Sequence, residues 1–489
     1  MNNGILIQDL SLNDPGENLP KTLLGSPNVI RTPYHYPTNT NSNNFIVICD
    51  TRASFNRSAY GTTQSPSRTI YLAIVVSYLQ RAIVDWGDGS YDVFQDTNWA
   101  TRPHTYSSHG VYTIQIISDN AFTFGSSSNL LDARPLINCV SFGNKVSGLT
   151  YAFFEAVNLK NIPNTLPVSI SSLNSFFWRA SNFNDINILN WNTSNITNMN
   201  QVFSDALSFN QPIGMWNTDN VTSMISAFSN ARSFNQPLNN WNVRKVTNFT
   251  SMFNGATSFN SSLSGWAPGA DTAGASCLNM FPGSAFNNSS ISSWDTSKVT
   301  NMGNMFSNIT SASGFNQDIG SWNTSSVTNM SLMFYNNTLF NNGGSSSING
   351  WNTSNVTTMT LMFYNTYFNQ PIGNWNVSKV ADMSNMFNIA RLFDQDISNW
   401  NLAGLNASTS LDNFMLNKTG SMTYSTANYD ALLIGWNNNK LAATNGVANW
   451  RTDLRPNFGG AKYTAGGAAA TARAALVSYG WTITDGGSV

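Results

Sequence analysis

The sequence is poor in charge and has no long apolar run. Charged residues make up 10% of the 489 residues, far below the roughly one quarter that is usual for soluble domains. The formal net charge is −1. Without a basic stripe to neutralise phosphates, this composition argues against a nucleic-acid partner. The longest apolar run, near residues 70–79, is too short to span a bilayer, so no membrane insertion is expected.

Cysteine is equally scarce. Cys49, Cys139 and Cys277 are too few and too far apart for a disulfide scaffold or a cysteine metal site. Small buried thiols pack as apolar groups, so we expect these three to be core residues.

Few residues are available for catalysis. Of three histidines, His35, His104 and His109, the last two lie near Asp85 and Asp88 in the sequence. Calcium would need a cluster of oxygens there. We favour a structural role and expect no metal, no cofactor and no enzyme activity. A glycosidase needs a fixed carboxylate pair. The repeat region described below has sparse acids, among them Asp205, Asp219, Asp318, Asp382, Asp394 and Asp396.

What the chain does have is a repeat. Tryptophans recur at steps of 24 to 29 residues, each preceded by a Phe-Asn or Phe-Asp pair. A fixed period of this length indicates a solenoid, in which each unit buries its apolar face against its neighbours. We therefore predict that the repeat tryptophans are core residues. They are Trp191, Trp216, Trp241, Trp266, Trp294, Trp322, Trp351, Trp375 and Trp400.

Residues 368–390 form the fullest copy of the repeat. Apolar residues follow Val380 at offsets of three, six to seven and ten, which predicts a short helix or 3₁₀ turn. Hydroxyl side chains at its start are expected to cap it. The Phe-Asn-Gln-Pro-Ile stretch is predicted to be a brief extended segment followed by a turn. The expected caps include Thr222, Thr247, Thr300, Thr328 and Thr357.

Asparagine recurs at a fixed phase after both Phe and Trp. Its amide can satisfy backbone groups of neighbouring coils that lack regular partners. We therefore predict a ladder of asparagines, with Asp394 substituting at one rung.

The chain divides by composition into segments. The segment 43–125 contains strand candidates at residues 45–49, 69–76, 82–86 and 111–117. The last segment contains helix candidates at residues 429–436 and 468–479 and a final strand at 481–484. The predicted order is an extended arm at 1–42, a β-sandwich at 43–125, a transition with a divergent first repeat at 126–180, the repeats at 181–420 and a cap at 421–489.

The repeated pattern Phe-Asn-Gln-Pro-Ile-x-x-Trp-Asn-Val-Ser-x-Val-Thr-x-Met-x-x-Met-Phe resembles the BspA-like leucine-rich-repeat surface proteins. Residues 84–90, 104–106 and 110–114 are similar to a PKD-type β-sandwich module. The closing residues 479–487 resemble the C-terminal unit of such proteins. The resemblance implies adhesion to host matrix or to other cells.

Together these observations predict a mainly β fold with short helices. An N-terminal β-sandwich is followed by a leucine-rich-repeat-like solenoid of about 24–29-residue repeats and a C-terminal helical cap.

No secretory signal or anchor is visible at either end of the sequence. We therefore expect a bacteriophage virion fibre or spike, extracellular after release, that attaches to virion proteins through residues 1–42. Its expected ligand is a host-surface glycan or protein bound by the solenoid. The alternatives are a structural virion decoration protein and a bacterial cell-surface adhesin lacking its export signal.

Tyr335, Tyr364 and Tyr367 are the candidate ligand-binding residues, because exposed tyrosines can stack on sugar rings. Core packing is the alternative role for them. Recognition is also expected at the lengthened coils around Trp266 and Trp351.

Overall fold

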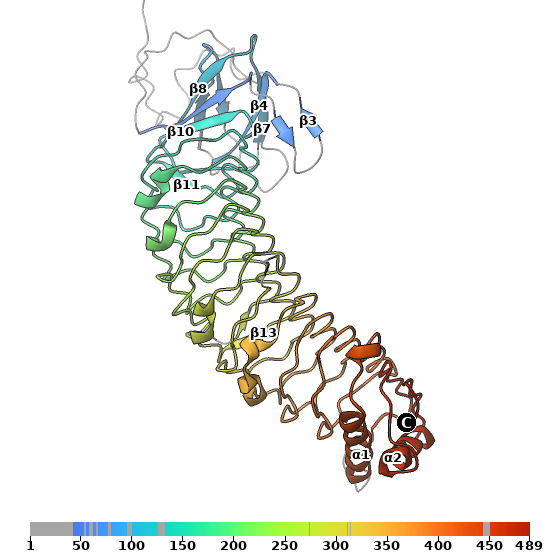
Figure 1. The fold of residues 1–489 in the computed structure, drawn as a ribbon. Coiled ribbons are helices and arrows are strands. Elements are labelled where there is room, and N and C mark those ends of the chain that lie inside the picture. Colours follow the sequence, from blue (N-terminus) through green and yellow to red (C-terminus); the bar gives the residue numbers. More distant parts are fainter. Residues whose placement is uncertain are drawn as a thin grey trace, which may run out of the picture. The chain divides into compact units, whose positions relative to one another are not determined.

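The computed structural model describes residues 43–52, 55–57, 62–64, 67–76, 80–94, 100–125, 133–272, 274–310, 312, 314–443 and 450–489. The described chain is mainly β, with few short helices, which confirms the coarse fold prediction (Figure 1). It divides into two compact units. The first runs to Ser172 and includes Arg179–Trp191, and the second consists of Leu173–Trp178 and Asn192–Val489. The predicted arm and His35 lie outside the described residues.

The first unit contains two main sheets. The predicted strands at 45–49, 69–76, 82–86 and 111–117 are all present, to within one residue at their ends. The five-stranded sheet has the order β10 (Leu136–Phe142), β1 (Phe45–Asp50), β8 (Val111–Ile117), β5 (Ala82–Asp85) and β6 (Tyr91–Phe94). The four-stranded sheet has the order β11 (Val146–Gly148), β9 (Phe122–Phe124), β4 (Thr69–Val76) and β7 (Ala100–Thr105). A separate hairpin joins β2 (Phe55–Arg57) to β3 (Thr62–Gln64).

The two sheets share an aromatic core. The ring of Phe45 on β1 lies 4.4 Å from that of Phe124 on β9, centroid to centroid. Trp86 is fully buried, and its indole Nε1 donates to Asp92 Oδ2 at 3.0 Å. Alternating burial along β6 places one face of that strand in this core. Strands β10 and β11 come from the segment predicted as a transition, so the sheets continue beyond residue 125.

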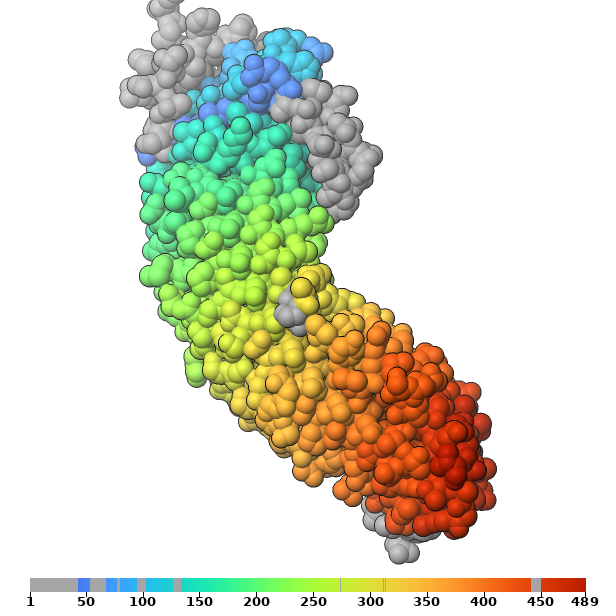
Figure 2. All heavy atoms as spheres, in the orientation of Figure 1, coloured from blue at the N-terminus to red at the C-terminus, as the bar shows by residue number. Residues whose placement is uncertain are grey.

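In the second unit, successive repeats lie side by side. Isolated parallel bridges join Asn198, Ser223, Asn248 and Ser276, and then Asn301, Asn329, Thr358 and Asp382. The short strands β12 (Ala275–Ser276) and β13 (Val299–Asn301) pair in the same parallel sense. We call residues 192–420 the array. Its atoms, coloured green through orange, form a continuous surface on the face shown in Figure 2.

The repeat tryptophans from Trp216 to Trp400 form a row inside the array, and Trp191 belongs to the first unit. The exposed fraction of each lies between 0% and 4%. Neighbouring indoles stack, as at Trp351 and Trp375, whose centroids are 5.9 Å apart. From Trp241 to Trp400 each Nε1 donates to the carbonyl of the Ile or Leu one repeat earlier, at 2.8–3.2 Å. The row therefore combines aromatic packing with a polar bond that fixes the spacing between repeats.

The asparagine after each Phe forms the predicted ladder. The Oδ1 atom of each accepts the backbone N–H of the same position in the next repeat, at 2.8–2.9 Å. Asp394 continues the ladder and accepts from the N–H of Ser425 at 2.9 Å, which confirms the predicted substitution. The rungs are Asn210, Asn235, Asn260, Asn287, Asn316, Asn341, Asn369 and Asp394.

The asparagine after each Trp has a different role. Asn217 Oδ1 accepts the N–H two residues on, from Asp219, at 2.9 Å, and Asn323 does the same for Ser325. These are local turns that a short amide side chain stabilises.

The prediction of a helix after the repeat Val is wrong. Ser226 and Asn230 have φ angles of 53° and 56°, in the left-handed region, which no right-handed helix contains. Alternate N–H groups donate to the next repeat instead of to residues four earlier. Met224, Ser226, Phe228 and Asn230 donate to the carbonyls of Asn248, Thr250, Met252 and Asn254. A helix this short is marginal alone, so bonding between repeats decides the conformation.

The threonines predicted as helix caps also have another role. Thr222, Thr247, Thr328 and Thr357 donate their N–H groups to the carbonyl of the equivalent residue one repeat earlier, at 2.8–3.0 Å. Thr300 bonds through its hydroxyl to Ala275 O. The short 3₁₀ helices lie elsewhere, mostly directly before the Trp, in the stretch predicted as a brief extended segment followed by a turn. They are η3 (Ile186–Asn190), η4 (Ile213–Met215), η5 (Ser289–Ser293), η6 (Asn342–Gly344) and η7 (Ser346–Gly350).

The C-terminal end covers the last repeat with residues that make the contacts of a further repeat. Helix α1 (Thr426–Ala443) provides Trp436, whose Nε1 donates to Ile397 O at 3.1 Å, as a repeat Trp would. The ring of Tyr424 stacks on Phe393 at 6.2 Å in place of the next Phe. The two predicted helices are confirmed as α1 and α2 (Ala468–Ser478), and η8 (Gly420–Met422) precedes them. The predicted last strand is reduced to isolated bridges.

A second amide row in the array is interrupted. Asn336 Nδ2 donates to Asn308 Oδ1 at 3.1 Å, and Asn365 Nδ2 donates to Asn336 Oδ1 at 3.2 Å. The next position is Ile389, with φ 58°. Within the described residues, no donor reaches the buried Asn365 Oδ1. A β-branched residue in the left-handed region is strained.

The substitution Ile389→Asn should therefore stabilise the protein. It relieves a left-handed strain of about 1–2 kcal/mol and gives Asn365 a donor, while losing part of the apolar burial of a half-buried side chain. We expect a net gain of about 1 kcal/mol in the free energy of unfolding, measured by urea denaturation. Ile389→Ala is the control, since it offers no amide. Equal losses of stability in both variants would contradict this account.

Lys418 is a buried charge where the array meets the cap. The side chain is 1% exposed, and its Nζ donates to Ala390 O at 2.8 Å. Burial lowers the pKa of its ammonium to about 8, although the charge of Asp394 opposes this shift. The unfolded chain, with an ordinary lysine pKa near 10.5, holds the proton over the window in which the folded chain has lost it.

Lys418 consequently destabilises the fold at pH 7, and this cost is relieved as the pH rises from about 8 to 10.5. We predict that the parent protein gains about 2 kcal/mol in free energy of unfolding, relative to Lys418→Met, between pH 7 and pH 10. Denaturation at both pH values measures it, with the exposed Lys462→Met as control. Parallel pH profiles for the parent and Lys418→Met would rule out the assignment.

Candidate ligand-binding surfaces

The three candidate tyrosines are half-buried and stand outside the buried rows. Each of the dipeptides Phe334-Tyr335 and Phe363-Tyr364 turns its Phe inward, where it is fully buried, and leaves its Tyr partly exposed. The two tyrosine rings stack at 5.0 Å with an interplanar angle of 21°. They form an aromatic step on the surface of the array.

Tyr367 lies on the same pair of repeats. The guanidinium carbon of Arg391 is 5.8 Å from its ring centroid, which is cation–π distance. The backbone N–H of Arg391 donates to Thr366 O at 2.9 Å, so Arg391 occupies the place next to Tyr367 in the following repeat. We call Tyr335, Tyr364, Tyr367 and Arg391 the tyrosine face.

The tyrosine face is local. The position after the inward Phe is Tyr in only two neighbouring repeats. Six other repeats carry a small or polar residue there: Ser204, Ser229, Asn254, Pro282, Ser307 and Asn388. At the two ends of the series the residue is large, namely Trp178 after Phe177 and the buried Met415 after Phe414. The buried row of rings needs only the Phe of each pair. A large aromatic residue directly after that Phe therefore indicates a role at the surface.

The lengthened coils are internally bonded. In the coil before Trp351, Asn342 is fully buried, and its Nδ2 donates to Ser345 O at 2.8 Å. Ser347 Oγ donates to Asp318 Oδ1 at 2.6 Å. In the coil after Trp266, Arg244 and Asp271 form an ion pair at 2.7 Å. These polar groups form hydrogen bonds and an ion pair with other residues of the array. Their geometry therefore does not single out the two coils as a ligand surface.

The histidines and acids of the first unit have structural partners. Asp88 Oδ2 lies 2.9 Å from His104 Nε2, and its Oδ1 accepts from the Ser90 hydroxyl and N–H. Burial raises the pKa of the Asp88 carboxyl. The hydrogen bonds together outweigh this effect, so the pKa lies below its usual range. Asp85 accepts from Gly87 N–H, and burial raises the pKa of its carboxyl. His109 Nδ1 lies 2.7 Å from Thr51 O.

The six array acids named in the sequence analysis behave similarly. Each accepts at least one hydrogen bond within the fold, from a backbone N–H, an amide, a hydroxyl or an indole. Within the described chain, three or more metal-ligating side chains never cluster. None of the described helices has the length and apolar content needed to cross a bilayer.

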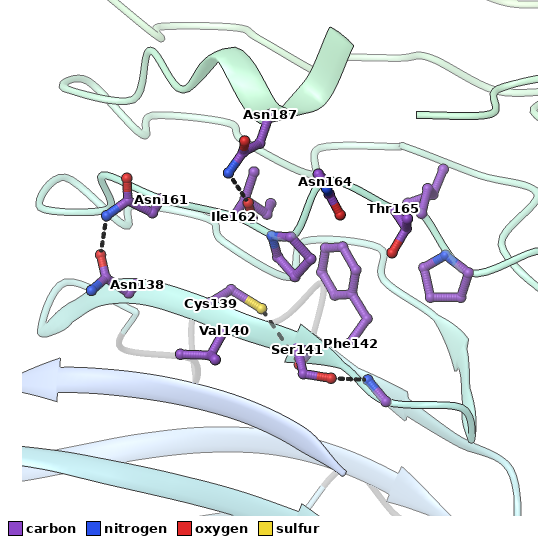
Figure 3. Close-up of a pocket in the computed structure, with 14 residues that line it drawn as sticks. Asn138, Cys139, Val140, Ser141, Phe142, Asn161, Ile162, Asn164, Thr165 and Asn187 are labelled. Carbon is purple, nitrogen blue, oxygen red and sulfur yellow. Dashed lines mark hydrogen bonds between the residues drawn. The ribbon is translucent and has the colours of Figure 1, made fainter. Parts of the chain in front are cut away.

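A pocket of about 580 Å³ lies in the first unit, between β10 and residues 161–167, with Asn187 of η3 beside it (Figure 3). Asn161 Nδ2 donates to Asn138 Oδ1 at 2.8 Å, and Asn187 Nδ2 donates to Ile162 O at 2.9 Å. These bonds hold three amides in place. Asn164 is exposed beside them.

The pocket also has apolar walls. The pairing of β1 with β10 skips Val140, so this residue bulges from the sheet and remains 50% exposed. Phe142, Pro163 and Pro167 complete the apolar part. All the described residues that line the pocket are uncharged. Sequence reasoning missed this site, since the lining comes from segments that only the fold brings together.

Comparison with known families gives a match over the repeats. The family described as Mycoplasma protein of unknown function, DUF285, matches residues 147–266, 275–347 and 343–449. Curated proteins and solved structures give no match. The match supports the predicted resemblance to BspA-like repeat proteins and does not include the PKD-like segment. More than half of the chain is covered, and the protein belongs to this DUF285 family.

Proposed function

We propose that this chain is a non-catalytic recognition protein that displays the tyrosine face to a ligand on another surface. Its array would be a leucine-rich-repeat-like solenoid, preceded by a PKD-type β-sandwich and closed by the helical cap. The parallel bridges and the Trp and Asn rows support the solenoid. The shared aromatic core of the two sheets supports the sandwich.

The observation that carries the proposal is the Tyr335–Tyr364 stack. Its rings are half-exposed on an array whose repeat Trp rings are at most 4% exposed. Tyrosine combines a flat apolar surface with a hydroxyl, and both are suited to sugars and to protein surfaces. Charged residues are scarce in the sequence, which suits an uncharged ligand such as a host-surface glycan, and Arg391 is the one charged member of the tyrosine face.

The virion location, and attachment through residues 1–42, remain predictions from the sequence. Immunolabelling of intact particles and of bacterial cells separates a fibre or spike from a decoration protein of the shell and from a cell-surface adhesin.

The double substitution Tyr335→Ala/Tyr364→Ala tests the proposed site. Labelled protein should bind saturably to host cells, and the double variant should bind about tenfold more weakly, since two ring contacts are lost. Leu392→Ala, which truncates a 53% exposed side chain of the array, is the matched control and should bind like the parent. Circular dichroism checks that the double variant is folded. A recognition role for the pair is rejected if the double variant binds like the parent. It is also rejected if the double variant is unfolded, because the two rings are then needed for the fold.

A further inference from the structure

We propose that the pocket beside β10 is a second, independent binding site for an uncharged sugar unit carrying an acetamido group. The site lies in the first unit and does not depend on the tyrosine face. Its volume of about 580 Å³ falls within the usual range for small-ligand sites.

The polar groups of the pocket fit the amide and hydroxyl groups of such a sugar. The bond from Asn161 Nδ2 to Asn138 Oδ1 holds both amides in position. Asn161 thereby keeps its Oδ1 as an acceptor, and Asn138 keeps its Nδ2 as a donor. Asn187 is held in the same way by Ile162 O and keeps its own Oδ1. Fixed donors and acceptors reduce the entropy lost when a ligand binds.

Asn164 and Thr165 provide polar groups that the fold does not use. Both residues line the pocket and are exposed, and within the described chain neither side chain forms a hydrogen bond. They are free to bond the hydroxyls of a ligand. Their substitution should leave the fold intact.

The apolar side of the pocket fits the rest of the sugar. The half-exposed Val140 offers its methyl groups to an acetamido methyl. The faces of Pro163 and Pro167 can contact the C–H face of a sugar ring. No charged residue appears among the described lining residues, so the site offers an acidic sugar no ion pair.

Calorimetric titration of the whole protein with N-acetylglucosamine, glucose and N-acetylneuraminic acid tests the proposal. We expect N-acetylglucosamine to bind about tenfold more tightly than glucose, which lacks the acetamido group. We expect the same margin over N-acetylneuraminic acid, which carries that group but whose carboxylate finds no ion pair among the described lining residues. Asn164→Ala should weaken this binding about tenfold. Asn190→Ala removes an exposed amide of η3 that does not line the pocket, and should bind as the parent does.

Two further variants separate this site from the tyrosine face. Val140→Thr should remove the preference for the acetamido sugar over glucose while retaining binding of both. Tyr335→Ala/Tyr364→Ala should titrate like the parent. The proposal is overturned if no neutral sugar binds, if Asn164→Ala binds as the parent does, or if the tyrosine variant loses the sugar.

Discussion

Hydrogen bonding between successive repeats is the constraint on which the array depends. Its backbone is neither regular helix nor long strand, so its N–H and C=O groups need partners elsewhere. The next repeat supplies them at a constant offset, as Met330, Leu332 and Phe334 show by donating to Thr358, Thr360 and Met362. Each side chain then lies against its counterpart one repeat away, which aligns the Trp row and the Asn ladder.

This constraint also separates scaffold from surface. Positions that must repeat are buried or bonded, as Trp375 and Asn369 are. Positions between them are free to vary, and Tyr335 and Tyr364 occupy one of these. The residues at these positions can therefore change without disturbing the rows. The same reasoning explains the cap, where Trp436 and Ser425 supply the contacts that a further repeat would have made.

The sequence was most informative where a residue type recurs at a fixed phase. The asparagine ladder and its Asp394 rung followed from such a pattern, whereas the helices of the cap were predicted from local composition outside the repeats. The helix after the repeat Val did not form, because apolar offsets of three, six to seven and ten fit a run of turns as well as a helix. Many of the left-handed positions carry Asn, a residue type that favours this conformation, but Ser226, Leu332 and Ile389 occupy others and give no such signal.

The candidate sites were predictable to different degrees. The tyrosines could be named because a tyrosine exposed on a repeat surface can stack on a sugar ring. The pocket could not, because Asn138 and Asn161 meet only through the parallel bridge between β10 and the following turn. No local pattern records that contact.

Deleting one whole repeat tests the central claim most directly. Removing residues 369–393 joins Phe368 to Asp394 and keeps the phase of both rows, whereas removing residues 369–381 shifts every later residue out of phase. Hydrogen exchange measures whether the array amides stay protected. The stacked account predicts near-parental protection after the whole-repeat deletion and loss of protection beyond residue 368 after the half-repeat deletion. Equal loss in both would contradict it.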